Sequence, residues 1–315
     1  MDVVLLIVSL GLIVAGADWL VAGSSSIARK AGISEFVIGL TIVGFGTSCP
    51  ELVVSLTGAF QGNADVAVGN VVGSNIFNVL FILGLTSLLF PVTMTESNRK
   101  KDIPVALVVT AVLILSGMSS SLLGIGRGDN LTRIEGVLFL LLFAGYLFES
   151  FHGEDRTPDT DGKVMKMPAA VLLSLVGLGA LIAGGELFVD SAVKIAHCLG
   201  VSDKFIAVTI LAGGTSLPEL ATSVVAAARH KDRLALGNIL GSNVFNILFI
   251  LGCSSLVTPL SFAGMTIADA AAILLSCVLL LIWAYTGKRC RIDRWEGAVM
   301  LLCFIGYYAF LFARG

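Results

Sequence analysis

The chain contains one polar motif twice: Gly-Thr-Ser-Cys-Pro-Glu at residues 46–51 and Gly-Thr-Ser-Leu-Pro-Glu at residues 214–219. A second pair lies in the same register, because residues 69–84 and 237–252 are identical at twelve of sixteen positions. Each pair is separated by 168 residues without a gap. After small length changes, residues 133–136 align with 294–297. The sequence therefore predicts two copies of one unit covering the whole chain.

The composition excludes a water-soluble globule. Of 315 residues, 56% are hydrophobic and 13% are charged, whereas soluble proteins are roughly a quarter charged. A membrane-spanning helix needs roughly 20 apolar residues, and the apolar runs predict an all-α integral membrane protein of ten transmembrane helices. We expect spans near residues 3–28, 36–60, 65–90, 103–118, 131–150, 168–196, 204–228, 234–257, 267–286 and 293–312. This leaves no room for a soluble catalytic domain, and the net charge of −2 gives no indication of nucleic-acid binding.

Five spans per copy make the second copy enter the membrane from the opposite side. The prediction is an inverted repeat, an arrangement typical of secondary transporters. We expect a first five-helix repeat at residues 1–150, with its motif at 39–84, and a second at 168–315, with its motif at 207–252. A cytoplasmic linker at 151–167 joins them. We expect helices 2, 3, 7 and 8 to be broken.

The distribution of positive charge predicts the orientation. Fifteen of the twenty Lys and Arg residues fall in the loops that join spans 1–2, 3–4, 5–6, 7–8 and 9–10. Positive loops stay in the cytoplasm. We therefore expect a multi-pass protein of the cell (inner) membrane with both termini extracytoplasmic.

The repeated motif places a proline and a carboxylate in the middle of spans 2 and 7. Pro50 and Pro218 cannot donate a backbone hydrogen bond, and such a break within a membrane is tolerated only beside protein or a polar cavity. Glu51 and Glu219 follow directly. Because a carboxylate inside a membrane is costly and usually functional, we interpret this pair as cation ligands.

The neighbouring polar groups all supply oxygen. Two hydroxyls precede each glutamate, and spans 3 and 8 add a serine and an asparagine four residues apart, hence on one helix face. Hard cations such as Ca²⁺, Na⁺, Mg²⁺ and Mn²⁺ prefer oxygen, and irregular geometry favours Ca²⁺ or Na⁺. The repeated glycines 69, 73, 237 and 241 are better explained by close helix packing. Asp18 and Glu186, within spans 1 and 6, could form a gate or proton relay or could simply pair near the span ends.

These motifs resemble the two alpha repeats of the cation/calcium exchanger superfamily, specifically the sodium/calcium exchanger-like antiporters of bacteria and archaea. The resemblance covers essentially the whole chain. It implies that spans 2, 3, 7 and 8 surround the ions and that spans 1 and 6 slide across them as a gate. The implied ion ligands are Thr47, Ser48, Glu51, Ser74, Asn78, Thr215, Ser216, Glu219, Ser242 and Asn246, with the carbonyl groups of Gly44 and Ala212 assisting.

One position departs from part of that superfamily. Some relatives, including potassium-dependent exchangers, carry aspartate where this chain has Asn246, so potassium dependence is not expected here. The Thr-Ser-x-Pro pattern favours sodium over protons as the driving ion.

The expected function is secondary antiport that exchanges Na⁺ for Ca²⁺ by alternating access and expels cytosolic Ca²⁺. A proton-coupled Ca²⁺/Mn²⁺ exchanger is the nearest alternative, and a passive cation channel is an alternative of another class. We expect no enzymatic activity and no cofactor. The expected partners are the lipid bilayer and the transported Ca²⁺ and Na⁺, with no nucleic acid, and the protein is expected to act as a monomer.

Overall fold

The computed structural model describes residues 2–124, 128–152, 164–199, 212–286 and 290–314. Within these ranges, seven helices are long and apolar enough to cross a membrane, and an eighth candidate is a helix pair, Glu35–Thr47 and Cys49–Phe60, bent by 49°. Two further expected spans correspond to a 15-residue helix, Ile103–Gly117, and to Leu217–Ala228. The latter follows residues 200–211, which lie outside the described ranges. The predicted all-helical membrane fold is confirmed.

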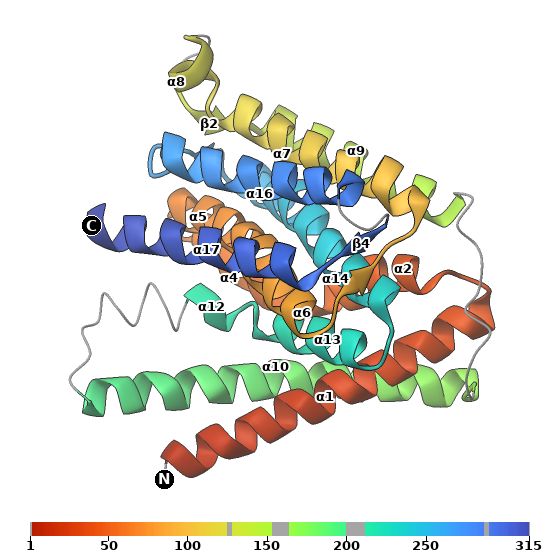
Figure 1. Ribbon diagram of the computed structural model, residues 1–315. Coiled ribbons are helices and arrows are strands. Elements are labelled where there is room, and N and C mark those ends of the chain that lie inside the picture. Colours follow the sequence, from red (N-terminus) through yellow and green to blue (C-terminus); the bar gives the residue numbers. More distant parts are fainter. Residues whose placement is uncertain (1, 125–127, 153–163, 200–211, 287–289, 315) are drawn as a thin grey trace.

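The helices of the first repeat can be followed in Figure 1. Span 1 is α1 (Asp2–Ala31), and span 2 consists of α2 (Glu35–Ile38), a π-helical segment (Gly39–Val43), α3 (Gly44–Thr47) and α4 (Cys49–Phe60). Span 3 consists of α5 (Ala64–Ile76), a π-helical segment (Phe77–Leu83) and α6 (Gly84–Leu89). After β1 (Val92–Thr93) and a π-helical segment (Asn98–Asp102) come α7 (Ile103–Gly117), α8 (Ser119–Leu123), β2 (Asn130–Leu131) and α9 (Arg133–His152).

The second repeat follows the same plan. Its described elements are α10 (Met167–Cys198), α12 (Ala212–Gly214), α13 (Leu217–Ala228), α14 (Asp232–Val244), a π-helical segment (Phe245–Ile250), α15 (Leu251–Val257), β3 (Leu260–Ser261), α16 (Ile267–Tyr285), β4 (Arg291–Ile292) and α17 (Arg294–Arg314). Residues 153–163 of the expected linker and 207–211 of the expected second motif lie outside the described ranges. The domain boundaries therefore stay a prediction.

Two short antiparallel sheets join the repeats in a symmetrical way. Strand β1 pairs with β4, and β2 pairs with β3, so each sheet contains one strand from each repeat. Val92 lies opposite Ile292, and Leu131 lies opposite Leu260. The two sheets lie toward opposite ends of the helices (Figure 1). This exchange of strands is what an inverted repeat with a two-fold relation between its halves predicts.

Spans 3 and 8 form the interior of the bundle. In the most apolar window of Asp232–Val257, 94% of the residues are buried, compared with 28% for α1 and for α10. The α-helical hydrogen-bond pattern of both central spans is interrupted by a π-helical segment. The prediction of interrupted helices is confirmed, with a π-helical segment in spans 3 and 8 and a bend at Ser48 in span 2.

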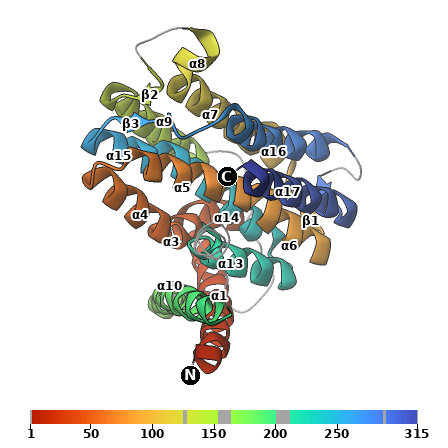
Figure 2. The same cartoon turned by 90° about the vertical axis from the view of Figure 1, so that its left-hand side faces the viewer.

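Helices α1 and α10 lie side by side along one edge of the molecule, next to α13 (Figures 1 and 2). Glycines allow their backbones to approach closely. A Cβ atom added to Gly177 would lie 2.5 Å from the backbone nitrogen of Leu20 and 2.7 Å from the carbonyl oxygen of Gly16. Small residues at such contacts are typical of tightly packed membrane helices. The two helices therefore form one packed unit.

A carboxylate organises the connection between α8 and β2. The backbone nitrogens of Ser120 and Ser121 each donate to Asp129 Oδ1 at 2.9 Å, and the Ser121 hydroxyl donates to Asp129 Oδ2. These donors hold the pKa of Asp129 below its usual value. The turn is therefore stabilised by the ionised form of this side chain.

Candidate functional site

The repeated motifs of the two halves meet at the broken ends of spans 2 and 7. Helices α4 and α13 each begin directly before a proline, Pro50 and Pro218, a position where the missing amide hydrogen costs nothing. Ser48 and Ser216, which precede these helices, have non-helical backbone angles. Each glutamate then falls in the first turn, where the partial positive charge of the helix terminus stabilises a carboxylate.

The two glutamates are held by serines of the opposite repeat. The Ser48 hydroxyl donates to Glu219 Oε1 at 2.9 Å, and the Ser216 hydroxyl donates to Glu51 Oε1 at 3.0 Å. Glu51 is 0% exposed and Glu219 is 1% exposed. The second oxygen of each carboxylate, Oε2, is buried without a hydrogen-bond partner in the described part of the chain. Each glutamate is thus bonded to the serine of the motif in the other repeat, and the role of the two glutamates as cation ligands stays a prediction.

Two asparagines have the same unsatisfied arrangement. Asn78 and Asn246 lie in the π-helical segments of spans 3 and 8 and are 1% and 0% exposed. Each side chain donates through Nδ2, but Oδ1 of each is buried and unpartnered among the described residues. Buried polar atoms are almost always hydrogen-bonded, so Oε2 of the two glutamates and Oδ1 of the two asparagines are free to accept a donor or to bind a cation.

The other expected ligands surround this centre with less uniform geometry. The Ser242 hydroxyl lies 3.4 Å from the carbonyl oxygen of Gly44, which also accepts the backbone N–H of Ser48 at 3.1 Å. The carbonyl oxygen of Gly44 is therefore already hydrogen-bonded within span 2. The Thr47 hydroxyl lies 3.0 Å from the carbonyl oxygen of Val43.

Three further expected ligands, Ser74, Thr215 and Ala212, lie on α5, between α12 and α13, and at the beginning of α12. Ser74 is buried at 3% exposure on α5, one turn before Asn78. Thr215 lines a cavity, and Ala212 begins α12.

Two asparagines that the sequence reasoning did not select support the glutamates. Asn70 donates to the carbonyl oxygen of Glu51 at 3.1 Å and to Ser55 Oγ at 2.9 Å. Asn238 donates in the same way to the carbonyl oxygen of Glu219 at 3.3 Å and to Ser223 Oγ. Their identity in both repeats was the signal that could have identified them.

The donor set consists of oxygen atoms, which fits a hard cation better than a soft metal. The described residues contain no group of three or more His, Cys, Asp and Glu side chains placed to hold a metal ion. Carboxylate, amide and hydroxyl oxygens are what Ca²⁺ and Na⁺ accept in irregular shells. Two buried carboxylates supply the charge, and neutral oxygens would complete the coordination.

A cavity of about 580 Å³ lies beside the two motifs and is lined by Cys49, Pro50, Gly214, Thr215 and Pro218 among others. It lies between α4 and α10, and its lining includes Thr215, Glu186 and Asp190. The residue equivalent to Glu186 in the first repeat is Asp18, which forms an ion pair with Arg229 at the end of α13. The pairing interpretation therefore fits Asp18, whereas Glu186 lines the cavity.

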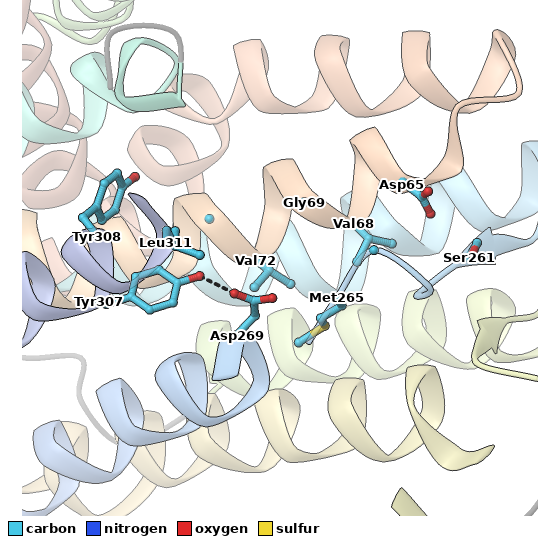
Figure 3. Close-up of a pocket in the computed structure, with 12 residues that line it drawn as sticks. Asp65, Val68, Gly69, Val72, Ser261, Met265, Asp269, Tyr307, Tyr308 and Leu311 are labelled. Carbon is cyan, nitrogen blue, oxygen red and sulfur yellow. Dashed lines mark hydrogen bonds between the residues drawn. The ribbon is translucent and has the colours of Figure 1, made fainter. Parts of the chain in front are cut away.

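A second cavity, of about 510 Å³, lies between α5, α16 and α17 (Figure 3). Its lining contains none of the expected ligands. The carboxylate of Asp269 is used there, because it accepts from Tyr307 at 2.7 Å and from the backbone N–H of Thr266 at 2.8 Å. This carboxylate caps the beginning of α16 and needs no cation.

Comparison with protein families gives a match over both repeats. The family described as "Sodium/calcium exchanger protein" matches residues 1–151 and 169–313. The chain belongs to the sodium/calcium exchanger family. It is a multi-pass membrane transporter and not an enzyme. The resemblance inferred from the repeated motifs is confirmed.

Individual members of this family are similar over nearly the whole chain. The putative antiporter CaxA of Alkalimonas amylolytica is 40% identical, over 98% of both chains. The sodium/calcium exchanger MaX1 of Methanosarcina acetivorans is 33% identical, again over 98% of both chains. A solved structure of the sodium-calcium exchanger NCX_Mj, soaked with Na⁺ and Ca²⁺, has a TM-score of 0.83 at 33% identity and covers 98% of this chain and 97% of that chain.

Proposed function

We propose that this exchanger-family protein is a secondary antiporter that exchanges Na⁺ for Ca²⁺ by alternating access, with Ca²⁺ expelled from the cytosol. The observation that carries the proposal is the set of four buried, unpartnered oxygens: Oε2 of Glu51 and Glu219, and Oδ1 of Asn78 and Asn246. All four belong to helices that come from the two inverted repeats. They supply two negative charges to a centre built for a cation.

Charge balance explains why such a site would exchange ions. Two ionised glutamates and one Ca²⁺ sum to zero, so the loaded site can pass the gate helices without a net charge in the membrane. An empty site would keep two buried charges, which is costly. Two Na⁺ would also neutralise it, whereas three would leave one positive charge, worth about 2.3 kcal/mol per 100 mV of membrane potential.

The arrangement of access fits the same proposal. The cavity between α4 and α10 lies beside the motifs and is lined by Thr215, while the Asp18–Arg229 ion pair joins α1 to α13. Since α1 and α10 pack as a unit, their sliding would open one side of the site as it closes the other.

We place both termini outside the cytoplasm because fifteen of the twenty Lys and Arg residues fall in the opposite loops. We propose that the protein acts as a monomer in the cell (inner) membrane.

Transport in proteoliposomes tests the proposal. Purified protein in Na⁺-loaded vesicles, diluted into Na⁺-free buffer with ⁴⁵Ca²⁺, should accumulate Ca²⁺. A K⁺ gradient with valinomycin sets the membrane potential and reveals whether the cycle moves net charge. Vesicles loaded with choline in place of Na⁺ are the control.

The alternatives give different results in the same vesicles. Uptake driven by a pH gradient without Na⁺ would identify a proton-coupled Ca²⁺/Mn²⁺ exchanger and would contradict sodium coupling. Flux that needs no ion on the opposite side, with unitary currents in planar bilayers, would identify a channel and would contradict antiport.

A further inference from the structure

Four asparagine side chains form a closed network between spans 3 and 8. Asn75 Nδ2 donates to the backbone carbonyl oxygen of Asn243 at 3.1 Å. A carbonyl can only accept, so this bond fixes which end of the Asn75 amide is nitrogen. The other end, Oδ1, then accepts from Asn246 Nδ2 at 3.1 Å. Asn246 is thereby held with its Oδ1 unpartnered, as a ligand oxygen must be.

The second repeat contains the same network in reverse. Asn243 Nδ2 lies 3.4 Å from the carbonyl oxygen of Asn75 and donates to it. Asn243 Oδ1 accepts from Asn78 Nδ2 at 3.0 Å, and Asn78 Oδ1 is left buried and unpartnered. Asn75 is 1% exposed and Asn243 is 4% exposed. The same arrangement occurs on both sides of the two-fold relation, with each bond crossing between repeats.

We propose that Asn75 and Asn243 are positioning residues, each of which orients the ligand asparagine of the opposite repeat. This inference rests on the proposed cation site. Asn75 acts on Asn246, and Asn243 acts on Asn78. Without its partner, the amide of Asn246 could rotate and turn its Nδ2, a positive dipole end, toward the cation.

The network also determines which side chain fits at position 246. Asn75 Oδ1 is an acceptor, so the atom facing it at position 246 has to be a donor. An ionised carboxylate there would bring two acceptors together in a buried place, at a cost in stability. The network therefore selects an amide at position 246 and limits the site to the two charges of Glu51 and Glu219.

A double-mutant cycle on ⁴⁵Ca²⁺ binding to the detergent-purified full chain tests the proposal. Loss of a group that orients a metal ligand typically weakens affinity about 10- to 100-fold. We expect Asn75→Ala to raise the Ca²⁺ dissociation constant by about tenfold. The same substitution should add less than about twofold to Asn246→Ala, because the group that it orients is already absent, but should keep its full effect in Asn78→Ala. Asn243→Ala should show the mirrored pattern.

A control and a second variant separate positioning from folding. Asn98 is a fully buried asparagine in the connection before α7, where it donates to Asp102. Asn98→Ala should therefore leave the Ca²⁺ dissociation constant unchanged even if the melting temperature falls. If Asn75→Ala does not yield folded protein, Asn75→Ser, whose shorter side chain cannot reach Asn246, replaces it in the same cycle.

The outcomes distinguish this inference from the proposed function. Equal effects of Asn75→Ala in the Asn246→Ala and Asn78→Ala backgrounds would mean general destabilisation and would overturn the positioning role. An unchanged dissociation constant in Asn75→Ala would also overturn it. If the wild-type protein binds Ca²⁺ but the effects of the two substitutions simply add, only the positioning role is refuted. If the wild-type protein binds neither Ca²⁺ nor Na⁺, the proposed function is refuted as well.

Discussion

Replacing Glu51 by glutamine should remove most Ca²⁺ binding while leaving the fold intact. Glutamine has the same shape, and its amide oxygen can still accept the Ser216 hydroxyl that now donates to Oε1 at 3.0 Å. What disappears is one of two negative charges and the unpartnered Oε2. Interactions with a charged group contribute roughly 1.5–3 kcal/mol. A loss of about 3 kcal/mol corresponds to about a 150-fold rise in the dissociation constant.

The assay is ⁴⁵Ca²⁺ binding by purified protein, with the melting temperature recorded for each variant. Glu219→Gln should give a loss of similar size, because Glu219 has the same environment in the second repeat. The matched control is Glu149→Gln, which makes the same chemical change at an exposed carboxylate that pairs with Lys101 at 3.1 Å. An affinity in Glu51→Gln within about threefold of the wild type would refute the reasoning, since less than ~0.7 kcal/mol would then depend on a buried charge.

Three further predictions concern the gate helices and a loop. Gly177→Leu should abolish transport and lower the melting temperature, because its Cβ would meet the α1 backbone; Gly179→Leu, where an added Cβ meets nothing within 4 Å among the described atoms, is the control. Arg229→Gln should change the melting temperature little, since exposed ion pairs contribute about 0–1 kcal/mol. It should, however, increase the labelling of cysteines on the side of the membrane where this ion pair joins α1 to α13. Exchanging the two charges of Asp18 and Arg229 should restore the protection of those cysteines from labelling. Asp129 has a lowered pKa, so its stabilisation is present above the usual aspartate pKa of about 3.9 and is lost as the pH falls below it; in thermal melts between pH 3 and 6, Asp129→Asn should weaken this acid dependence, and an unchanged profile would contradict it.

Much of the site could be predicted from the sequence because the chain repeats itself. Membrane location follows from composition, since too few charged residues are present to cover a water-exposed surface. The importance of Glu51 and Glu219 follows from the cost of an intramembrane carboxylate beside a helix-breaking proline. Asn78 and Asn246 could be selected because they lie one turn after a repeated serine. These inferences use only local spacing and transfer energies, which a single sequence contains.

The supporting contacts could not be predicted in the same way. The sequence shows that Asn70, Asn75, Asn238 and Asn243 are repeated, but glycine and asparagine at helix interfaces are compatible with simple packing. Their roles depend on which group of a neighbouring span they meet: Asn70 and Asn238 donate to span 2 or 7 of their own repeat, and Asn75 and Asn243 donate to the other repeat. Such contacts join residues 15–171 positions apart, and spacing along one helix does not specify them.

By itself, the sequence determined that the protein has two inverted repeats of membrane helices with a pair of buried carboxylates, because hydrophobic length, loop charge and an odd number of spans per repeat suffice for that. Only the tertiary structure decided the cross-repeat bonds: each glutamate is held by the serine of the other repeat, and each ligand asparagine by an asparagine of the other repeat. The physical reason is that hydrogen bonds depend on the direction of donors and acceptors within a few ångströms. That direction is established only when spans 2, 3, 7 and 8 pack together.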